Sequence, residues 1–344
     1  MTTLTRDARL DASAAKIRPP FTLDPELRFY SPQDNRDAFA LPRVASWLEF
    51  IVNEWTPAPV AGTTSRVALF VPCTKYKPYS TSREHRAINA ALLHAGWAPA
   101  GQSSAPDELQ ALLEDDEDPA LFHEGPLRRG DVVLDRFVIS EPMALVPYDH
   151  IYHWNGEASP ATAYDDPGLF ESRGTSVSPE RADCTAVPRK DGSWAWGPGE
   201  RDAYVDAHEF LVGAISETLE RLAAHYYSMV AWVSPGLTHR SFFADRALRK
   251  QEGLPASKQG ASGRRELTGV LDRHPGMVDV LPTRAQIDEA KRQLAERLAR
   301  EDRTQTDGAV RSVFARGDGN DTPLGLPELL AHLIGHLDTA AGGR

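Results

Sequence analysis

The stretch RVALFVPCTKYKPYSTSREHRAINAALLHAG, residues 66–96, decides the fold. Its first part, residues 66–73, is an apolar run that is too short for a typical helix and rich in branched or aromatic side chains, so it predicts a buried parallel strand. Apolar residues at helical spacing follow and end at Gly96, and Thr81 and Glu84 have the spacing of a capping box. The order of strand, loop and helix indicates an α/β protein.

Working outward, further segments have the patterns of helices and strands. Apolar stripes at helical spacing predict helices over residues 41–55 and 200–227, and continuous apolar runs predict strands around Val132–Ile139 and over 228–236. Three segments are predicted to be irregular: a loop at 141–149, long ordered loops over 151–200 and a flexible basic loop at 253–266. Residues 283–302 are predicted to form a surface helix.

These patterns divide the chain into three parts. Residues 1–40 are rich in Pro, Asp and Arg with little periodicity, which is typical of an arm that wraps the surface or is partly disordered. Residues 41–235 contain the α/β elements and form the expected catalytic core. Residues 236–344 are expected to form a helical, partly flexible C-terminal region.

The composition narrows the class of protein. The chain has 344 residues, of which 41% are hydrophobic and 25% charged, and these proportions exclude a disordered or fibrous protein. A net charge of −11 disfavours bulk nucleic-acid binding. The two cysteines, Cys73 and Cys184, cannot build a disulfide scaffold, and no apolar run approaches the roughly 20 residues that span a bilayer. We therefore expect a cytoplasmic protein that is not embedded in a membrane.

The loop after the first strand is the best candidate for chemistry. Open α/β sheets bind ligands at the carboxyl ends of their strands, which is where Cys73 is predicted to lie. A helix N-terminus and the ammonium groups of Lys75 and Lys77 would lower the pKa of this thiol, whereas Ser82 and His85 would share a helix face. Taken alone, a cysteine at a strand end is more often a small buried apolar residue than a nucleophile.

Residues 72–85 read Pro-Cys-x-x-x-Lys-Pro-Tyr-x-x-Ser-x-x-His, which is similar at each fixed position to the signature of archaeosine synthase. Enzymes of that family modify 7-cyano-7-deazaguanine in tRNA. Residues 141–147 and 164–167 resemble two further stretches of the family, although Ala144 stands where the family pattern prefers glycine. The resemblance covers roughly residues 41–235.

The resemblance implies a three-layer α/β core with a mainly parallel sheet, similar to the uracil-DNA-glycosylase fold. It also implies an amidine-forming transferase in which a nitrile receives an amine, from lysine or another nitrogen donor. Cys73 would add to the nitrile and form a thioimidate, Lys77 would stabilise the thiolate or the developing negative nitrogen, and His85 would carry protons. Tyr79 and Ser82 would orient these groups.

The candidates for substrate binding lie in the signature and in the loop-rich residues that follow the second predicted strand. Pro72 belongs to the signature itself, and a guanine-like edge needs a carboxylate, for which Glu141, Glu157 and Asp165 are the candidates. Aromatic side chains that are candidates for stacking on the base are Tyr152, Trp154 and Tyr164. No glycine-rich phosphate loop or convincing metal-ligand set is present in the sequence, so we expect neither a cofactor nor a metal.

The sequence leaves other functions open. The acceptor is a free base, a nucleoside, tRNA or DNA, and the absence of a recognisable RNA-binding module favours a small molecule slightly. One alternative is a non-catalytic module that binds a deazapurine or a nucleic-acid base. Another is a glycosylase-like enzyme acting on modified tRNA or DNA. Self-association is also left open.

Overall fold

The computed structural model describes residues 6–165, 176–235, 238–320 and 322–342. Its α-helices are α1 (Arg6–Ala14), α2 (Pro32–Ala38), α3 (Pro42–Glu49), α4 (Arg83–His94), α6 (Pro198–Leu222), α7 (Thr238–Phe243), α8 (Arg246–Glu252), α9 (Val270–Arg273), α10 (Arg284–Arg300), α11 (Asp307–Ala315) and α12 (Pro327–Gly342). Its strands are β1 (Ser65–Pro72), β2 (Ala98–Pro99), β3 (Leu127–Arg129), β4 (Val132–Ser140), β5 (Ala144–Pro147), β6 (His153–Trp154), β7 (Glu157–Ala158), β8 (Val187–Pro188), β9 (Trp194–Ala195), β10 (Ser228–Trp232), β11 (Ser257–Gly260), β12 (Gly263–Glu266) and β13 (Asp279–Leu281).

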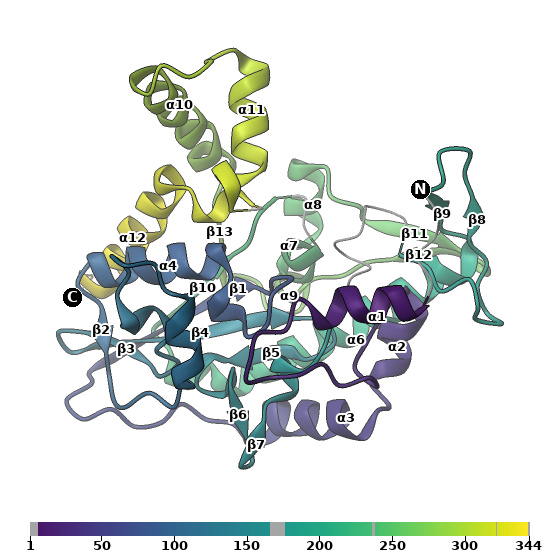
Figure 1. Ribbon diagram of the computed structural model, residues 1–344, viewed down its shortest axis with the longest axis horizontal. Helices are drawn as coiled ribbons and strands as arrows, with labels where there is room; N and C mark the ends of the chain where they lie inside the picture. Colours follow the sequence, from purple (N-terminus) through teal and green to yellow (C-terminus); the bar gives the residue numbers. More distant parts are fainter. Residues whose placement is uncertain (1–5, 166–175, 236–237, 321, 343–344) are drawn as a thin grey trace.

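A mixed sheet of seven strands forms the centre of the molecule (Figure 1). The strand order is β13-β10-β1-β4-β3-β2, and β5 pairs with β4 outside this path. Strands β13, β10, β1 and β4 run parallel to their neighbours in this group, whereas β2, β3 and β5 pair in the antiparallel sense. The α/β class predicted from the sequence is thus confirmed, with a sheet that is parallel in its central part.

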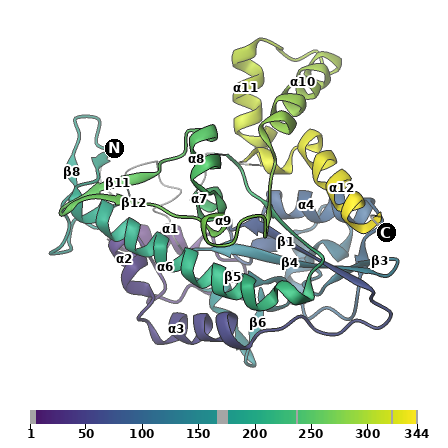
Figure 2. The same ribbon diagram turned by 180° about the vertical axis from the view of Figure 1, so that it is seen from behind.

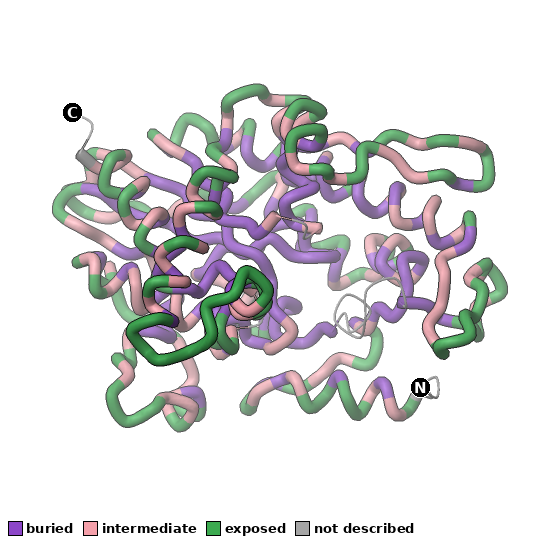
Figure 3. Tube along the Cα trace, turned by 90° about the horizontal axis from the view of Figure 1, so that it is seen from above, coloured by how far each residue is buried: buried purple, intermediate pink, exposed green. Residues whose placement is uncertain are grey.

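Helices lie on both faces of this sheet. Helices α4 and α12 lie above it in Figure 1 and α3 lies below, and the reverse view in Figure 2 shows α6 crossing the lower face. Every residue of β4 is buried, and the buried part of the chain in Figure 3 follows the sheet through the middle of the molecule. The apolar runs predicted as strands therefore form the core because both of their faces are covered.

The strands that follow β1 in the chain lie on both sides of it in the sheet. After β1 it passes through α4 and reaches β4, whereas β10, on the opposite side of β1, follows α6. Such a reversal of strand order opens a crevice at the carboxyl ends of the strands. The ends of β1, β4 and β10 are therefore the part of the sheet best placed to bind a ligand.

Three local predictions need correction. The start of α4 is capped by Ser82, whose Oγ accepts a hydrogen bond from the backbone N–H of His85 at 3.2 Å, so the cap lies one residue after the expected Thr81. The expected loop at 141–149 contains β5, because the chain reverses directly after β4 and pairs back onto it. The expected loop at 253–266 contains the hairpin β11–β12.

The N-terminal arm wraps over the core, as one of the two readings of residues 1–40 expected. Ile17 forms an isolated parallel bridge with Lys77 of the loop after β1. The backbone N–H of Lys77 donates to the carbonyl of Lys16 at 3.1 Å, and the N–H of Arg18 donates to the carbonyl of Lys77 at 2.8 Å. The arm therefore holds the loop in which the sequence placed the chemistry.

The C-terminal region is largely helical, as predicted. Helices α10 and α11 stand away from the sheet in both ribbon views (Figures 1 and 2), whereas α12 packs against α4. In the part of the chain that the structure describes, we find no helix with both the length and the apolar character needed to cross a membrane.

Candidate active site at the carboxyl ends of β1, β4 and β10

Three neighbouring strands bring one functional side chain each to the same edge of the sheet. Cys73 directly follows β1 and Glu141 directly follows β4, and the backbone N–H of Cys73 donates to the carbonyl of Ile139 at 2.9 Å. His239 lies in α7, shortly after β10. The parallel register therefore gathers residues from positions 73, 141 and 239, which are far apart in the sequence.

The side chains of Cys73 and His239 are in direct contact. The Sγ of Cys73 lies 3.3 Å from Nε2 of His239, and both side chains are buried. Burial raises the pKa of Cys73 to about 11, against the smaller opposite effect of Lys77, and burial lowers the pKa of His239 to about 4. Both groups are therefore neutral at pH 7, and in the tautomer with its hydrogen on Nδ1 the imidazole accepts the S–H at Nε2.

This state differs from the thiolate expected from the sequence. The helix N-terminus and the nearby lysines were expected to lower the pKa of the thiol, but Cys73 is only 7% exposed and the loss of hydration dominates. Desolvation disfavours the charged form of any buried group unless strong partners compensate. A thiolate at this position requires loss of the thiol proton, and His239 lies next to the sulfur.

His85 contacts other groups. Its Nε2 lies 2.9 Å from the carbonyl oxygen of Pro72 and its Nδ1 lies 2.7 Å from the hydroxyl of Tyr148. Because a carbonyl only accepts, Nε2 carries the hydrogen and Nδ1 accepts from Tyr148. Burial lowers the pKa of His85 to about 4. With both ring nitrogens engaged, this histidine ties the end of β1 to α4 and to the start of the loop after β5.

Lys77 lies fully buried close to Cys73. Its Nζ donates to the carbonyl of Thr74 at 2.6 Å and stands 4.3 Å from the centre of the Tyr164 ring. The positive charge also opposes the effect of burial on the pKa of Cys73. The Lys77 ammonium therefore favours negative charge on the sulfur.

Two predicted tyrosines form a buried hydroxyl cluster with Ser140, the last residue of β4. The hydroxyl of Tyr79 lies 3.0 Å from that of Tyr164, and Ser140 Oγ lies 3.1 and 2.8 Å from the two oxygens. Burial raises the pKa of both phenols. The cluster supplies neutral hydroxyl groups beside the thiol and fixes the loop after β1 against β4.

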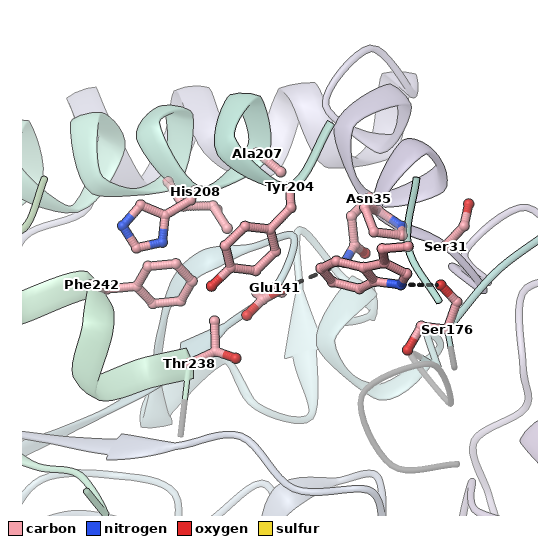
Figure 4. A pocket seen from close by; sticks show the side chains of 12 residues that line it. Ser31, Asn35, Glu141, Ser176, Tyr204, Ala207, His208, Thr238 and Phe242 are labelled. Atoms are coloured by element: carbon pink, nitrogen blue, oxygen red, sulfur yellow. Dashed lines mark hydrogen bonds between the residues drawn. The ribbon is translucent and has the colours of Figure 1, made fainter. Parts of the chain in front are cut away.

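A narrow cavity of about 20 Å³ lies beside Glu141 and Thr238, near the Cys73–His239 pair. Figure 4 shows Glu141 near its centre, with Tyr204 from α6 above it and Thr238 from α7 below. The residues that line it are Ser31, Pro32, Asn35, Glu141, Ser176, Trp196, Tyr204, Ala207, His208, Leu211, Thr238 and Phe242. Two of these residues connect the cavity to the pair. Thr238 directly precedes His239 in the chain, and a backbone group of Glu141 hydrogen-bonds the Cys73 thiol.

The structure separates the three candidate carboxylates. Glu141 lines the cavity and accepts a hydrogen bond from the amide of Asn35 at 3.4 Å. Asp165 is buried and accepts from Lys16 of the arm at 2.9 Å. Glu157 is exposed on the small hairpin β6–β7, remote from this cavity lining. Glu141 is thus the carboxylate positioned to meet a ligand; Asp166 and Pro167 of the matching stretch lie outside the described residues.

The aromatic rings around the cavity are different from those expected. Tyr152 is buried and donates to the carbonyl of Phe122 at 2.8 Å, and Trp154 packs on Trp47. The rings that line the cavity come mainly from the segment around α6 and from α7: Trp196, Tyr204 and Phe242. One signal was present, because residues 204, 208 and 211 share a face of the predicted helix over 200–227, but an apolar helix face usually packs in the core.

Among the residues that the structure describes, no cluster of three or more His, Cys, Asp and Glu side chains is arranged to hold a metal ion. Comparisons of the chain with protein-family models, curated proteins and solved structures find no match. The geometry of this site and the motifs in the sequence are therefore the basis for assigning a function.

Proposed function

We propose that this protein is a cysteine-dependent transferase that converts the nitrile of a 7-cyano-7-deazaguanine-type base into an amidine. The observation that carries the proposal is the 3.3 Å contact between Cys73 Sγ and His239 Nε2, beside a cavity that contains Glu141. The resemblance of residues 72–85 to the archaeosine synthase signature supplies the choice of substrate.

The proposed reaction begins with addition of the thiol to the nitrile. The sulfur of Cys73 bonds to the nitrile carbon, one π bond of C≡N breaks, and His239 transfers the thiol proton to the nitrogen. Lys77 stabilises negative charge during this step. The product is a neutral thioimidate, so no oxidant or reductant is needed.

An amine then completes the reaction. The lone pair of an amine, supplied by lysine or another nitrogen donor, bonds to the thioimidate carbon, and collapse of the adduct breaks the C–S bond. The amine loses one proton and the departing sulfur regains one, for which His239 is again the carrier. The balance is one nitrile and one amine in, one amidine out, with Cys73 restored.

Once the narrow cavity opens around a ligand, its lining presents groups suited to a flat heterocycle. Carboxylate and amide groups from Glu141 and Asn35 provide acceptors and a donor for a guanine-like edge. The rings of Trp196 and Tyr204 provide aromatic surface on which such a ligand can stack. We propose that the acceptor is a small molecule and that the protein acts in the cytoplasm. We also propose that the core is related to the uracil-DNA-glycosylase fold, because helices cover both faces of its central sheet.

Intact-protein mass spectrometry tests the proposal. The wild-type protein and the variants Cys73→Ala and Cys184→Ala are incubated with 7-cyano-7-deazaguanine, and separately with its nucleoside, without an amine. We expect the mass to increase by one ligand in the wild type and in Cys184→Ala, and to stay unchanged in Cys73→Ala. Lysine added afterwards should release the adduct as an amidine.

Two results would contradict the proposed function. One is the absence of an adduct with either ligand on a wild-type protein whose circular dichroism shows it to be folded. The other is an equal adduct on Cys73→Ala. Binding without any covalent change would indicate the non-catalytic module instead, and release of a base from tRNA or DNA would indicate the glycosylase.

A further inference from the structure

A histidine on α6 has one ring nitrogen anchored and the other unused by the protein. Nε2 of His208 lies 2.8 Å from the carbonyl oxygen of Thr268. Because a carbonyl oxygen only accepts, Nε2 must carry the ring hydrogen, which leaves a lone pair on Nδ1. Among the described residues, this buried Nδ1 has no hydrogen-bond partner.

The surroundings keep His208 in this form. Arg249 Nη2 donates to the same Thr268 carbonyl at 2.9 Å and lies 3.4 Å from Nε2, so its positive charge opposes protonation of the ring. Burial and Arg249 together lower the pKa of His208 to about 4, although the backbone carbonyl acts in the opposite direction. At neutral pH the imidazole is therefore uncharged, and its Nδ1 is an acceptor.

His208 forms part of the wall of the candidate cavity. Its ring centre lies 6.0 Å from that of Tyr204 and 5.0 Å from that of Phe242. In Figure 4 these three rings lie together at the end of the cavity away from Ser31 and Ser176. Leaving a buried acceptor without a donor costs free energy, and an occupant with an N–H group at this end would remove that cost.

We propose that His208 is a binding residue whose Nδ1 accepts an N–H from the cavity's occupant, so that the site selects a free base over its nucleoside. The inference rests on the proposed function and narrows its substrate class. A 7-deazaguanine-type base has N–H donors on both rings: the pyrimidinone edge would face Glu141, and the pyrrole N–H would face His208. A nucleoside has a sugar in place of that pyrrole hydrogen and cannot make the second bond.

Two variants separate binding from packing. In His208→Gln the longer side chain places an amide N–H where Nε2 lies, so the bond to Thr268 is kept while the Nδ1 acceptor is lost. In His208→Asn the shorter side chain places its oxygen where Nδ1 lies, so the acceptor is kept while the bond to Thr268 is lost. A purely structural role predicts that Gln is the milder replacement in every measurement.

The experiment measures Kd by calorimetry for 7-deazaguanine and for 7-deazaguanosine, neither of which has a nitrile. We expect the wild type to bind the free base at least about tenfold more tightly than the nucleoside, since one buried hydrogen bond corresponds to roughly that factor. His208→Gln should weaken binding of the free base about tenfold and leave the nucleoside unchanged. His208→Asn should stay within about threefold of the wild type, despite a lower melting temperature.

The possible results test the role of His208 independently of the proposed chemistry at Cys73. Equal affinity for base and nucleoside, an unchanged Kd for the base in His208→Gln, or no binding of 7-deazaguanine to the folded wild type would each overturn the role of His208. A covalent adduct with 7-cyano-7-deazaguanine would still support the proposed function in the first two cases. Selective binding of 7-deazaguanine without any adduct from the nitrile would support His208 and contradict the chemistry.

Discussion

Cys73 and His239 are separated by 166 residues in the sequence, and 3.3 Å separates Sγ from Nε2 in the fold. The two residues follow neighbouring parallel strands, and burial keeps both uncharged. A neutral thiol in contact with a neutral imidazole whose Nε2 is free of hydrogen needs only one short proton transfer to become a nucleophile. The same desolvation that raises the pKa of the thiol also makes the thiolate more reactive once it forms.

Replacing His239 should slow the chemistry more than it weakens the fold. We expect His239→Gln to reduce the rate of adduct formation with 7-cyano-7-deazaguanine by about a hundredfold, the usual contribution of a positioned general base. Time-resolved intact-mass measurements give that rate. The exposed His225, changed to Gln, is the matched control and should leave the rate unchanged; a rate in His239→Gln equal to that control would remove His239 from the mechanism.

His85 should affect stability rather than chemistry. His85→Ala leaves the Tyr148 hydroxyl and the Pro72 carbonyl without their buried partner, and the expected loss is on the order of 3 kcal/mol of unfolding free energy. Urea denaturation measures this loss. Adduct formation per folded molecule should remain near the wild-type rate. Normal stability together with a strongly reduced rate would assign the proton transfer to His85, as the sequence motif first predicted.

Stability should fall steeply in mild acid. The pKa values of His85, His208 and His239 are each lowered to about 4 by burial, from an unfolded value of 6.5. Between these values the unfolded chain binds three protons that the folded chain does not, so stability is fully present above pH 6.5 and is lost as the pH falls toward 4. Histidine protonation alone therefore predicts acid denaturation in this range.

Two buried carboxyl groups, Asp135 and Asp149, oppose this effect, because burial raises the pKa of each. Burial raises the pKa of Asp135 to about 6, so the folded protein binds one proton there before the unfolded chain does. Among the groups whose pKa values lie between 4 and 6.5, three histidine protons minus the one on Asp135 leave a difference of two near pH 5, which corresponds to about 3 kcal/mol of unfolding free energy per pH unit. Denaturant titrations at pH 7, 6 and 5 measure the slope. An unfolding free energy that stays level from pH 7 to 5 would contradict neutral buried histidines.

Ala144 has a backbone conformation that favours glycine. Its φ is +58° at the start of β5, at the position where the resembled family prefers glycine. For Ala144→Gly, relief of the left-handed strain and the loss of a buried methyl group oppose each other, so unfolding free energy should change by less than about 1 kcal/mol. Ala144→Val should cost about 2–4 kcal/mol, because a branched side chain is strained and overpacked there. Equal stabilities of the Gly and Val variants in urea would contradict this geometry.

The sequence predicted the edge of the sheet at which the site lies, because a strand and a helix that are adjacent in the chain have local patterns. Residues 66–96 contained the strand, the loop and the helix, and their order already placed Cys73 at a carboxyl end. The reversal into β5 was missed since four residues are too few to show an alternating pattern. The capping-box spacing of Thr81 and Glu84 predicts a cap at Thr81, whereas the helix begins after Ser82, whose side chain accepts from the N–H of His85.

The partners of Cys73 could not be predicted in the same way. His239 reaches the thiol through the register of β10 beside β1, which is a property of the assembled sheet. The resemblance of residues 72–85 implies that His85 is the proton carrier, whereas in the structure its ring is held by Pro72 and Tyr148. The protonation state of the thiol likewise depends on burial, a three-dimensional quantity that outweighs the local charges of the lysines.

The pairing of the N-terminal arm with the loop after β1 makes these two segments one cooperative opening unit. Both backbone hydrogen-bonding groups of Lys77 are occupied by the arm, through Lys16 and Arg18. The loop therefore cannot detach from the sheet unless the arm detaches with it, and the amides of Arg18 and Lys77 should exchange with solvent hydrogen at a common rate. A ligand that tightens the loop would slow exchange in the arm, and any change that loosens the arm would weaken that ligand by the same free energy.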